Sequence, residues 1–92
     1  MTDMVRKKAT IVNKLGLHAR PCAQLVSVAA RYQSEVYLIK DDMRVNGKSI
    51  MGVMMLAAER GSELTFEASG ADEEAAIDAL VRVVQSGFGE EI

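Results

Sequence analysis

Residues 13–22 of the chain read Asn13-Lys14-Leu15-Gly16-Leu17-His18-Ala19-Arg20-Pro21-Cys22. A β-compatible segment precedes this stretch, Gly16 allows a sharp change of direction, and an alanine-rich run follows. The stretch is therefore predicted to join a strand to a helix. It holds the only histidine and the only proline of the sequence, and it places His18 at the start of the helix.

The predicted start of this helix has the properties of an anion site beside an imidazole. The backbone amides of Ala19 and Arg20 have no partner within such a helix, and Pro21 has no amide hydrogen. These amides, the positive end of the helix dipole and the Arg20 guanidinium favour an anion of the size of phosphate. Because the same field disfavours imidazolium, a neutral and nucleophilic His18 is expected, able to accept a phosphoryl group. The plainer alternative is a capping or half-buried packing histidine.

Length, composition and charge limit the class of protein. The 92 residues suffice for one domain, over residues 1–92, with a modest core. A net charge of −2 argues against a nucleic-acid binder, and no apolar run approaches the ~18 residues of a membrane span. The lone Cys22 cannot form an internal disulfide, which favours a reducing cytoplasm. Its place in the helix pattern makes it a packing residue.

Apolar periodicity predicts four strands and three helices. Strands are expected at residues 5–12, 35–40, 43–45 and 62–68, and helices at residues 19–30, 50–56 and from 72 to just before Gly87. The order β-α-β-β-α-β-α predicts an α+β fold of two layers, with helices on one face of an antiparallel sheet and water on the other. In the last strand, the side chains expected to face the core are those of Leu64, Phe66 and Ala68, and those expected to face water are Glu63, Thr65 and Glu67.

The short helix after Ser49 carries more apolar side chains than so short an element can bury. Ser49 is expected to cap this helix, and a phosphate on Ser49 would lie at the positive helix terminus. Some of the apolar side chains are expected to form a surface for partners, because methionine adapts to different shapes. The surface would hold Ile50, Met51 and Met54, with filling of a core gap as the alternative, whereas Met55 and Leu56 are assigned to the core.

Two segments together strongly resemble HPr, the family of histidine-containing phosphocarriers of the bacterial phosphoenolpyruvate-dependent phosphotransferase system. They are Gly16-Leu17-His18-Ala19-Arg20-Pro21 and Gly47-Lys48-Ser49-Ile50-Met51-Gly52-Val53-Met54, and the likeness extends to Gly70-Ala71-Asp72-Glu73. The resemblance implies an open-faced β-sandwich with strand order 1-4-2-3. The ending at residues 85–91 resembles the nitrogen-related branch, NPr, more than the sugar-transport branch. Cys22 departs from the family, which commonly has alanine there.

The resemblance also implies roles for particular residues. His18 would accept a phosphoryl group on its δ nitrogen from enzyme I and pass it to an EIIA-type protein, with Arg20 as the active-site arginine. Ser49 matches the serine that a dedicated kinase phosphorylates in some bacteria. The implied docking residues are Leu17, Ile50, Met51 and Met54. The chain would be a monomeric carrier rather than an enzyme, with no cofactor, metal, nucleic acid or membrane as a partner.

Two other functions fit part of the sequence. In one, the chain is a regulatory binding protein, and phosphorylation of His18 or Ser49 decides which target it binds. In the other, it is an acylphosphatase-like enzyme on a similar two-layer fold. Such an enzyme needs a phosphate-cradling loop with an arginine and a positioned asparagine, and the sequence contains no such loop.

Overall fold

Eight elements follow one another in residues 4–92, which are the residues that the computed structural model describes. They are β1 (Val5–Thr10), α1 (Ala19–Ala29), β2 (Glu35–Lys40), β3 (Met43–Asn46), α2 (Ile50–Met55), β4 (Glu63–Ser69), α3 (Glu73–Gln85) and the 3-10 helix η1 (Gly87–Gly89). The predicted order of strands and helices is confirmed. β1 ends at Thr10 rather than at residue 12, and η1 was not predicted.

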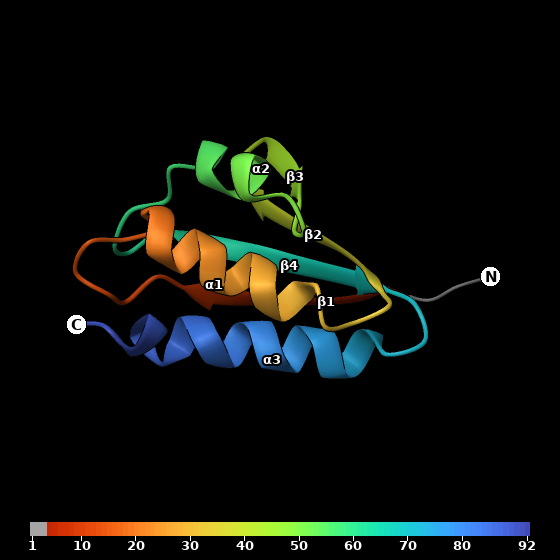
Figure 1. The fold of residues 1–92 in the computed structure, drawn as a ribbon. Helices are drawn as coiled ribbons and strands as arrows, with labels where there is room; N and C mark the ends of the chain where they lie inside the picture. The colour runs from red at the N-terminus through yellow and green to blue at the C-terminus, as the bar shows by residue number, and fades with distance from the viewer. Residues whose placement is uncertain (1–3) are drawn as a thin grey trace.

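The four strands form one antiparallel sheet in the order β1-β4-β2-β3, as the resemblance implied. β4 lies between β1 and β2, so that Leu64 is opposite Ala9 and Phe66 is opposite Leu38. Figure 1 shows α1 and α3 along one face of the sheet, with α2 beside α1 and β3. The predicted two-layer α+β fold is confirmed.

The core lies between the sheet and the helices. Its strand residues follow the predicted alternation, because side chains two positions apart share a face. In β4 the core side chains are Leu64, Phe66 and Ala68, and in α3 they include Ile77, Leu80 and Val84. Fully burying one such aliphatic or aromatic side chain stabilises the fold by about 1.5–3 kcal/mol. α1 contributes Cys22 and Leu25 to the same core, which fixes the helix that begins after His18.

The open face of the sheet carries a buried carboxylate, which corrects one prediction. Glu67 faces away from the helices as predicted, yet it is only 4% exposed. Arg6 donates to Glu67 Oε2 from Nε at 2.9 Å and from Nη2 at 2.6 Å, and Arg44 Nε donates to Oε1 at 3.3 Å. Arg44 also lies over the ring of Tyr37, 3.8 Å from its centroid. The alternation predicts the face on which Glu67 lies, but its burial depends on side chains of β1 and β3, and only β1 is adjacent to β4 in the sheet.

Candidate functional site

A buried asparagine shapes the loop from β1 to α1. Asn13 Nδ2 donates to the Gly16 carbonyl at 2.8 Å, and the Gly16 amide donates back to the Asn13 carbonyl at 3.2 Å. Gly16 has a φ of 70°, and a Cβ there would lie 2.8 Å from the carbonyl oxygen of Ala58, so the turn requires glycine. The next amide, of Leu17, donates to that same carbonyl at 2.8 Å. These contacts fix the backbone immediately before His18.

His18 is the N-cap residue of α1, where the sequence placed it. Its backbone is extended, with φ −78° and ψ −175°, and its carbonyl accepts the Cys22 amide at 3.1 Å. The side chain makes no capping hydrogen bond and is 37% exposed. The amides of Ala19 and Arg20 therefore keep no acceptor within the helix. The imidazole is free of a capping role and lies at the positive end of α1.

A carboxylate that the sequence analysis missed faces the ring. Glu90 Oε1 lies 2.9 Å from His18 Nε2 and accepts from Asn13 Nδ2 at 3.1 Å. The hydrogen bond with His18 lowers the pKa of Glu90, with a smaller contribution from Asn13 and against the effect of desolvation. The Glu90 carboxylate thus places a negative charge beside the ring, opposite in sign to the positive end of α1. Glu90 is 72 residues away in sequence, and no local pattern marks it.

Arg20 lies on the first turn of α1 with an exposed side chain. Within residues 4–92 its guanidinium makes no hydrogen bond or ion pair. It borders a surface hollow of about 370 Å³, whose other lining residues are Ala23, Gln24, Ser27, Val28 and Arg31. The predicted histidine and arginine thus occupy one end of α1, and the arginine is available to an anion.

Cys22 is a packing residue, as predicted. Its side chain is buried and its thiol donates to the Leu17 carbonyl at 3.4 Å. Burial raises the pKa of the Cys22 thiol. This is the opposite of the lowering that a helix N-terminus can give to an exposed cysteine, so the nearby helix start does not activate the thiol.

Ser49 caps α2 as predicted, since its Oγ accepts the Gly52 amide at 3.1 Å. The following exposed side chains are called the α2 patch: Ile50, Met51, Met54 and Met55. The prediction that Met55 belongs to the core is wrong, because it is 65% exposed, whereas Leu56 is buried as predicted. In so short a helix only the row facing α1 and the sheet, which holds Val53, reaches the core.

Leu17 lies in the core rather than on this surface. It is only 5% exposed, so it offers a partner little apolar area, although the resemblance assigned it to docking. Leu15, two residues earlier, is 72% exposed. Leu17 instead supports the loop that carries His18.

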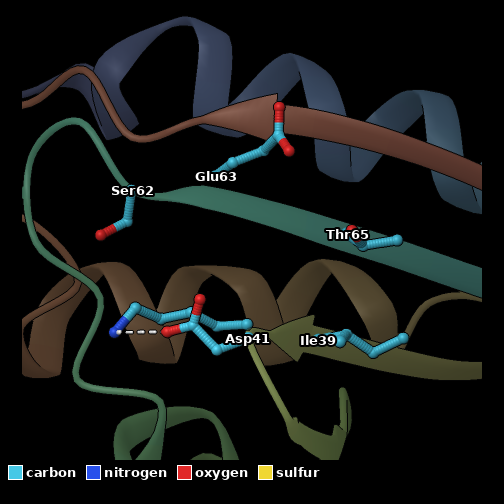
Figure 2. A pocket seen from close by; sticks show the side chains of 6 residues that line it. Ile39, Asp41, Ser62, Glu63 and Thr65 are labelled. Atoms are coloured by element: carbon cyan, nitrogen blue, oxygen red, sulfur yellow. Dashed lines mark ion pairs between the residues drawn. The ribbon is translucent and has the colours of Figure 1, made fainter.

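A second hollow lies away from the histidine. It has a volume of about 440 Å³ and opens where β2 ends and β4 begins (Figure 2). Lys40 Nζ lies 3.9 Å from Asp41 Oδ2 at its rim. The remaining lining residues are Ile39, Ser62, Glu63 and Thr65. None of the predicted site residues borders this hollow.

Within residues 4–92, no helix is long and apolar enough to span a bilayer. Over the same range, no three side chains of histidine, cysteine, aspartate or glutamate come together as a set that could hold a metal ion.

Fold and site define a class: an open-faced β-sandwich that presents a solvent-accessible histidine and an arginine at a helix N-terminus. Residues 5–86 match the family model described as "PTS HPr component phosphorylation site". The chain belongs to the HPr family of phosphocarrier proteins of the phosphotransferase system. The phosphocarrier protein HPr of Treponema pallidum is 49% identical over 88 residues, which cover 96% of this chain and 100% of the relative.

Solved structures of HPr proteins agree with this assignment. A crystal structure of HPr-C-His from Thermoanaerobacter tengcongensis has a TM-score of 0.91 and 45% identity, covering 96% of this chain and 99% of the other. A crystal structure of an HPr dimer from the same organism has a TM-score of 0.76 and 49% identity, covering 87% and 92% of the two chains. The expectation of a monomer is therefore not confirmed.

Proposed function

We propose that the chain accepts a phosphoryl group on His18 from phosphorylated enzyme I and passes it to an EIIA-type protein. The observation that carries the proposal is the imidazole at the N-cap of α1, which makes no capping bond and stays 37% exposed. A group that must meet two partners in turn needs such exposure. The family assignment supports the same role.

The proposed step is an in-line transfer. The Nδ1 lone pair of His18 attacks the phosphorus, and the bond from phosphorus to the donor breaks. The amides of Ala19 and Arg20 and the Arg20 guanidinium hold the phosphoryl oxygens, whose charge they offset. His18 Nδ1 has no hydrogen-bond partner within the described residues, which leaves it open to the donor. Transfer to the acceptor reverses the step.

The α2 patch is the proposed docking surface for both partners, since α2 packs beside α1 and the patch is apolar. Ser49 is a proposed regulatory site for a serine kinase or phosphorylase. A phosphate there would add negative charge next to the patch and so weaken docking of an acidic surface. The carrier is proposed to act as a monomer in the cytoplasm, where its partners would be found.

The test is intact-mass analysis after incubation with phosphoenolpyruvate and a bacterial enzyme I. One acid-labile phosphoryl group is expected on the wild type and none on His18→Ala, because the nucleophile is lost. Arg20→Ala should slow the transfer without abolishing it, since the amides remain. Phosphorylation of His18→Ala would contradict the assignment of the nucleophile, and unchanged kinetics of Arg20→Ala would remove that residue from the mechanism. Offering sugar-type and nitrogen-type EIIA proteins then identifies the branch.

The exposed α2 patch also supports a second function, that of a regulatory protein. In this case the phosphorylation state of His18 or Ser49 decides binding to a target, and onward transfer is incidental. Capture experiments with unmodified and phosphorylated chain separate the two functions. State-dependent capture of purified targets that accept no phosphoryl group would favour regulation.

A further inference from the structure

The chain folds back on itself after α3. Residues 86–91 are called the C-terminal turn. Three successive residues of this turn have a left-handed backbone conformation, and Phe88, with φ 59°, is the one of the three that is not glycine. The buried Phe88 side chain anchors the turn, and Gln24 Nε2 donates to the Phe88 carbonyl at 3.3 Å. The Lys14 amide donates to the Glu91 carbonyl at 2.9 Å. The turn is therefore fastened on both sides of Glu90.

Glu90 contacts two side chains at the site, those of Asn13 and His18, and accepts a hydrogen bond from Asn13. One end of the Asn13 amide lies within hydrogen-bond distance of two oxygens, Glu90 Oε1 and the Gly16 carbonyl. Because only the amide nitrogen can donate to both, this end is Nδ2. A glutamate carboxyl is ionised at neutral pH, and an ionised carboxylate only accepts hydrogen bonds. The 2.9 Å contact with His18 therefore requires a hydrogen on Nε2.

We infer that Glu90 is a positioning residue of the phosphoryl transfer, which holds His18 as the tautomer with hydrogen on Nε2 and so presents the Nδ1 lone pair. The inference rests on the proposed function. It explains why Nδ1 and not Nε2 would attack the phosphorus, because a neutral imidazole with hydrogen on Nε2 has its only lone pair in the ring plane on Nδ1.

The step balances without any change of protonation. The Nδ1 lone pair forms the bond to phosphorus, and the electron pair of the broken bond leaves with the donor. The ring keeps its Nε2 hydrogen and gains a positive charge, which the Glu90 carboxylate offsets at 2.9 Å. When the acceptor takes the phosphoryl group, the electron pair returns to Nδ1 and the ring is neutral again.

Two measurements on Glu90→Ala test the inference, with Glu91→Ala as the matched control. Glu91 is the next residue, but its carboxylate lies 3.9 Å from Lys14 Nζ and makes no hydrogen bond within residues 4–92. Long-range ¹⁵N–¹H NMR of His18 in its neutral form reports the tautomer. The wild type and Glu91→Ala should show hydrogen on Nε2, and Glu90→Ala should show a larger share of hydrogen on Nδ1.

The second measurement is the rate of phosphoryl transfer from phosphorylated enzyme I, followed by stopped flow. For Glu90→Ala we expect kcat to fall roughly tenfold, by analogy with the loss of activity when the hydrogen-bond partner of a metal-ligating histidine is removed. KM should stay unchanged, because the α2 patch is intact. An unchanged tautomer or an unchanged kcat would overturn the inference. A wild type that takes no phosphoryl group would instead overturn the proposed function, and the NMR spectra distinguish this case because they need no enzyme I.

Discussion

His18 combines a fixed backbone with an open side chain. Its main chain is set by the Asn13–Gly16 turn and by the first hydrogen bond of α1. Among residues 4–92, Glu90 alone forms a hydrogen bond with its ring. A reacting group must be placed well before the encounter, since ordering it during the reaction costs free energy. The site meets this requirement without closing over the histidine, as the proposed transfer between two partners would need.

The first residue-scale prediction concerns Cys22. In the native chain this thiol should react with an aromatic disulfide reagent far more slowly than in the urea-unfolded chain, because it is buried and burial raises its pKa. Release of the coloured thiolate measures the rate at pH 8 in both states. Equal rates would mean that the start of α1 opens readily. The Cys22→Ala variant gives the background signal of the assay, since the chain has one cysteine.

At the scale of elements, local signals predicted most of the chain correctly. The Ser49 cap and the alternation in β4 depend on residues within three or four positions, so the sequence displays them directly. Met55 was misassigned because apolar character alone does not say which side of a two-turn helix meets the core. Residues fixed by distant partners were missed altogether, as with the cover over Glu67 and the contact of Glu90 with His18.

The element-scale prediction concerns α2. If the α2 patch is the docking surface proposed above, replacing both Met51 and Met54 by serine should raise KM for phosphorylated enzyme I several-fold and leave kcat unchanged, because the change removes binding contacts and no reacting group. Both side chains are exposed, Met51 at 78%, so the free energy of unfolding should change by only about 0.5 kcal/mol. Steady-state kinetics and urea unfolding measure the two quantities.

Met43 offers a matched control for this experiment. It is an exposed methionine on β3, outside the α2 patch. Met43→Ser should leave KM as in the wild type. A rise in KM for Met43→Ser equal to that of the double variant would mean that loss of exposed methionine as such, and not the α2 patch, affects the encounter.

At the scale of the molecule, one carboxylate ties the start of α3 to the loop before β2. Asp72 Oδ1 accepts from Ser34 Oγ at 2.6 Å and from the Ser34 amide at 3.0 Å, and Oδ2 accepts from the Gln33 amide at 2.9 Å. The hydrogen bond from the Ser34 hydroxyl is the main cause of a lowered pKa at Asp72, followed by the Gln33 amide. The link joins segments 38 residues apart.

The lowered pKa of Asp72 predicts a dependence of stability on pH. The carboxyl binds its proton more tightly in the unfolded chain, with a pKa near 3.9, so its stabilising effect is complete above that pH. The effect is lost as pH falls through the lower pKa of the folded chain. Asp72→Asn should therefore lower Tm at pH 7, and the difference from the wild type should shrink below about pH 4.

Thermal unfolding followed by circular dichroism between pH 2.5 and 7 measures this difference. Asp42→Asn is the control, since Asp42 is an exposed aspartate in the turn between β2 and β3 with no hydrogen bond within the described residues. Its Tm should follow the wild type at every pH. A difference for Asp72→Asn that stays constant down to pH 2.5 would contradict the assigned role of the carboxylate.

The C-terminal turn has a practical consequence for anyone who attaches a label or a fusion partner. Ile92 follows Glu90 by two residues, so a foreign chain joined after it would begin near the contact between Glu90 and His18 and take up space that the proposed partners would need. Val5, at the start of β1, lies at the far end of that strand from the loop that leads to His18 (Figure 1). Immobilisation through this other end keeps the histidine facing the solution.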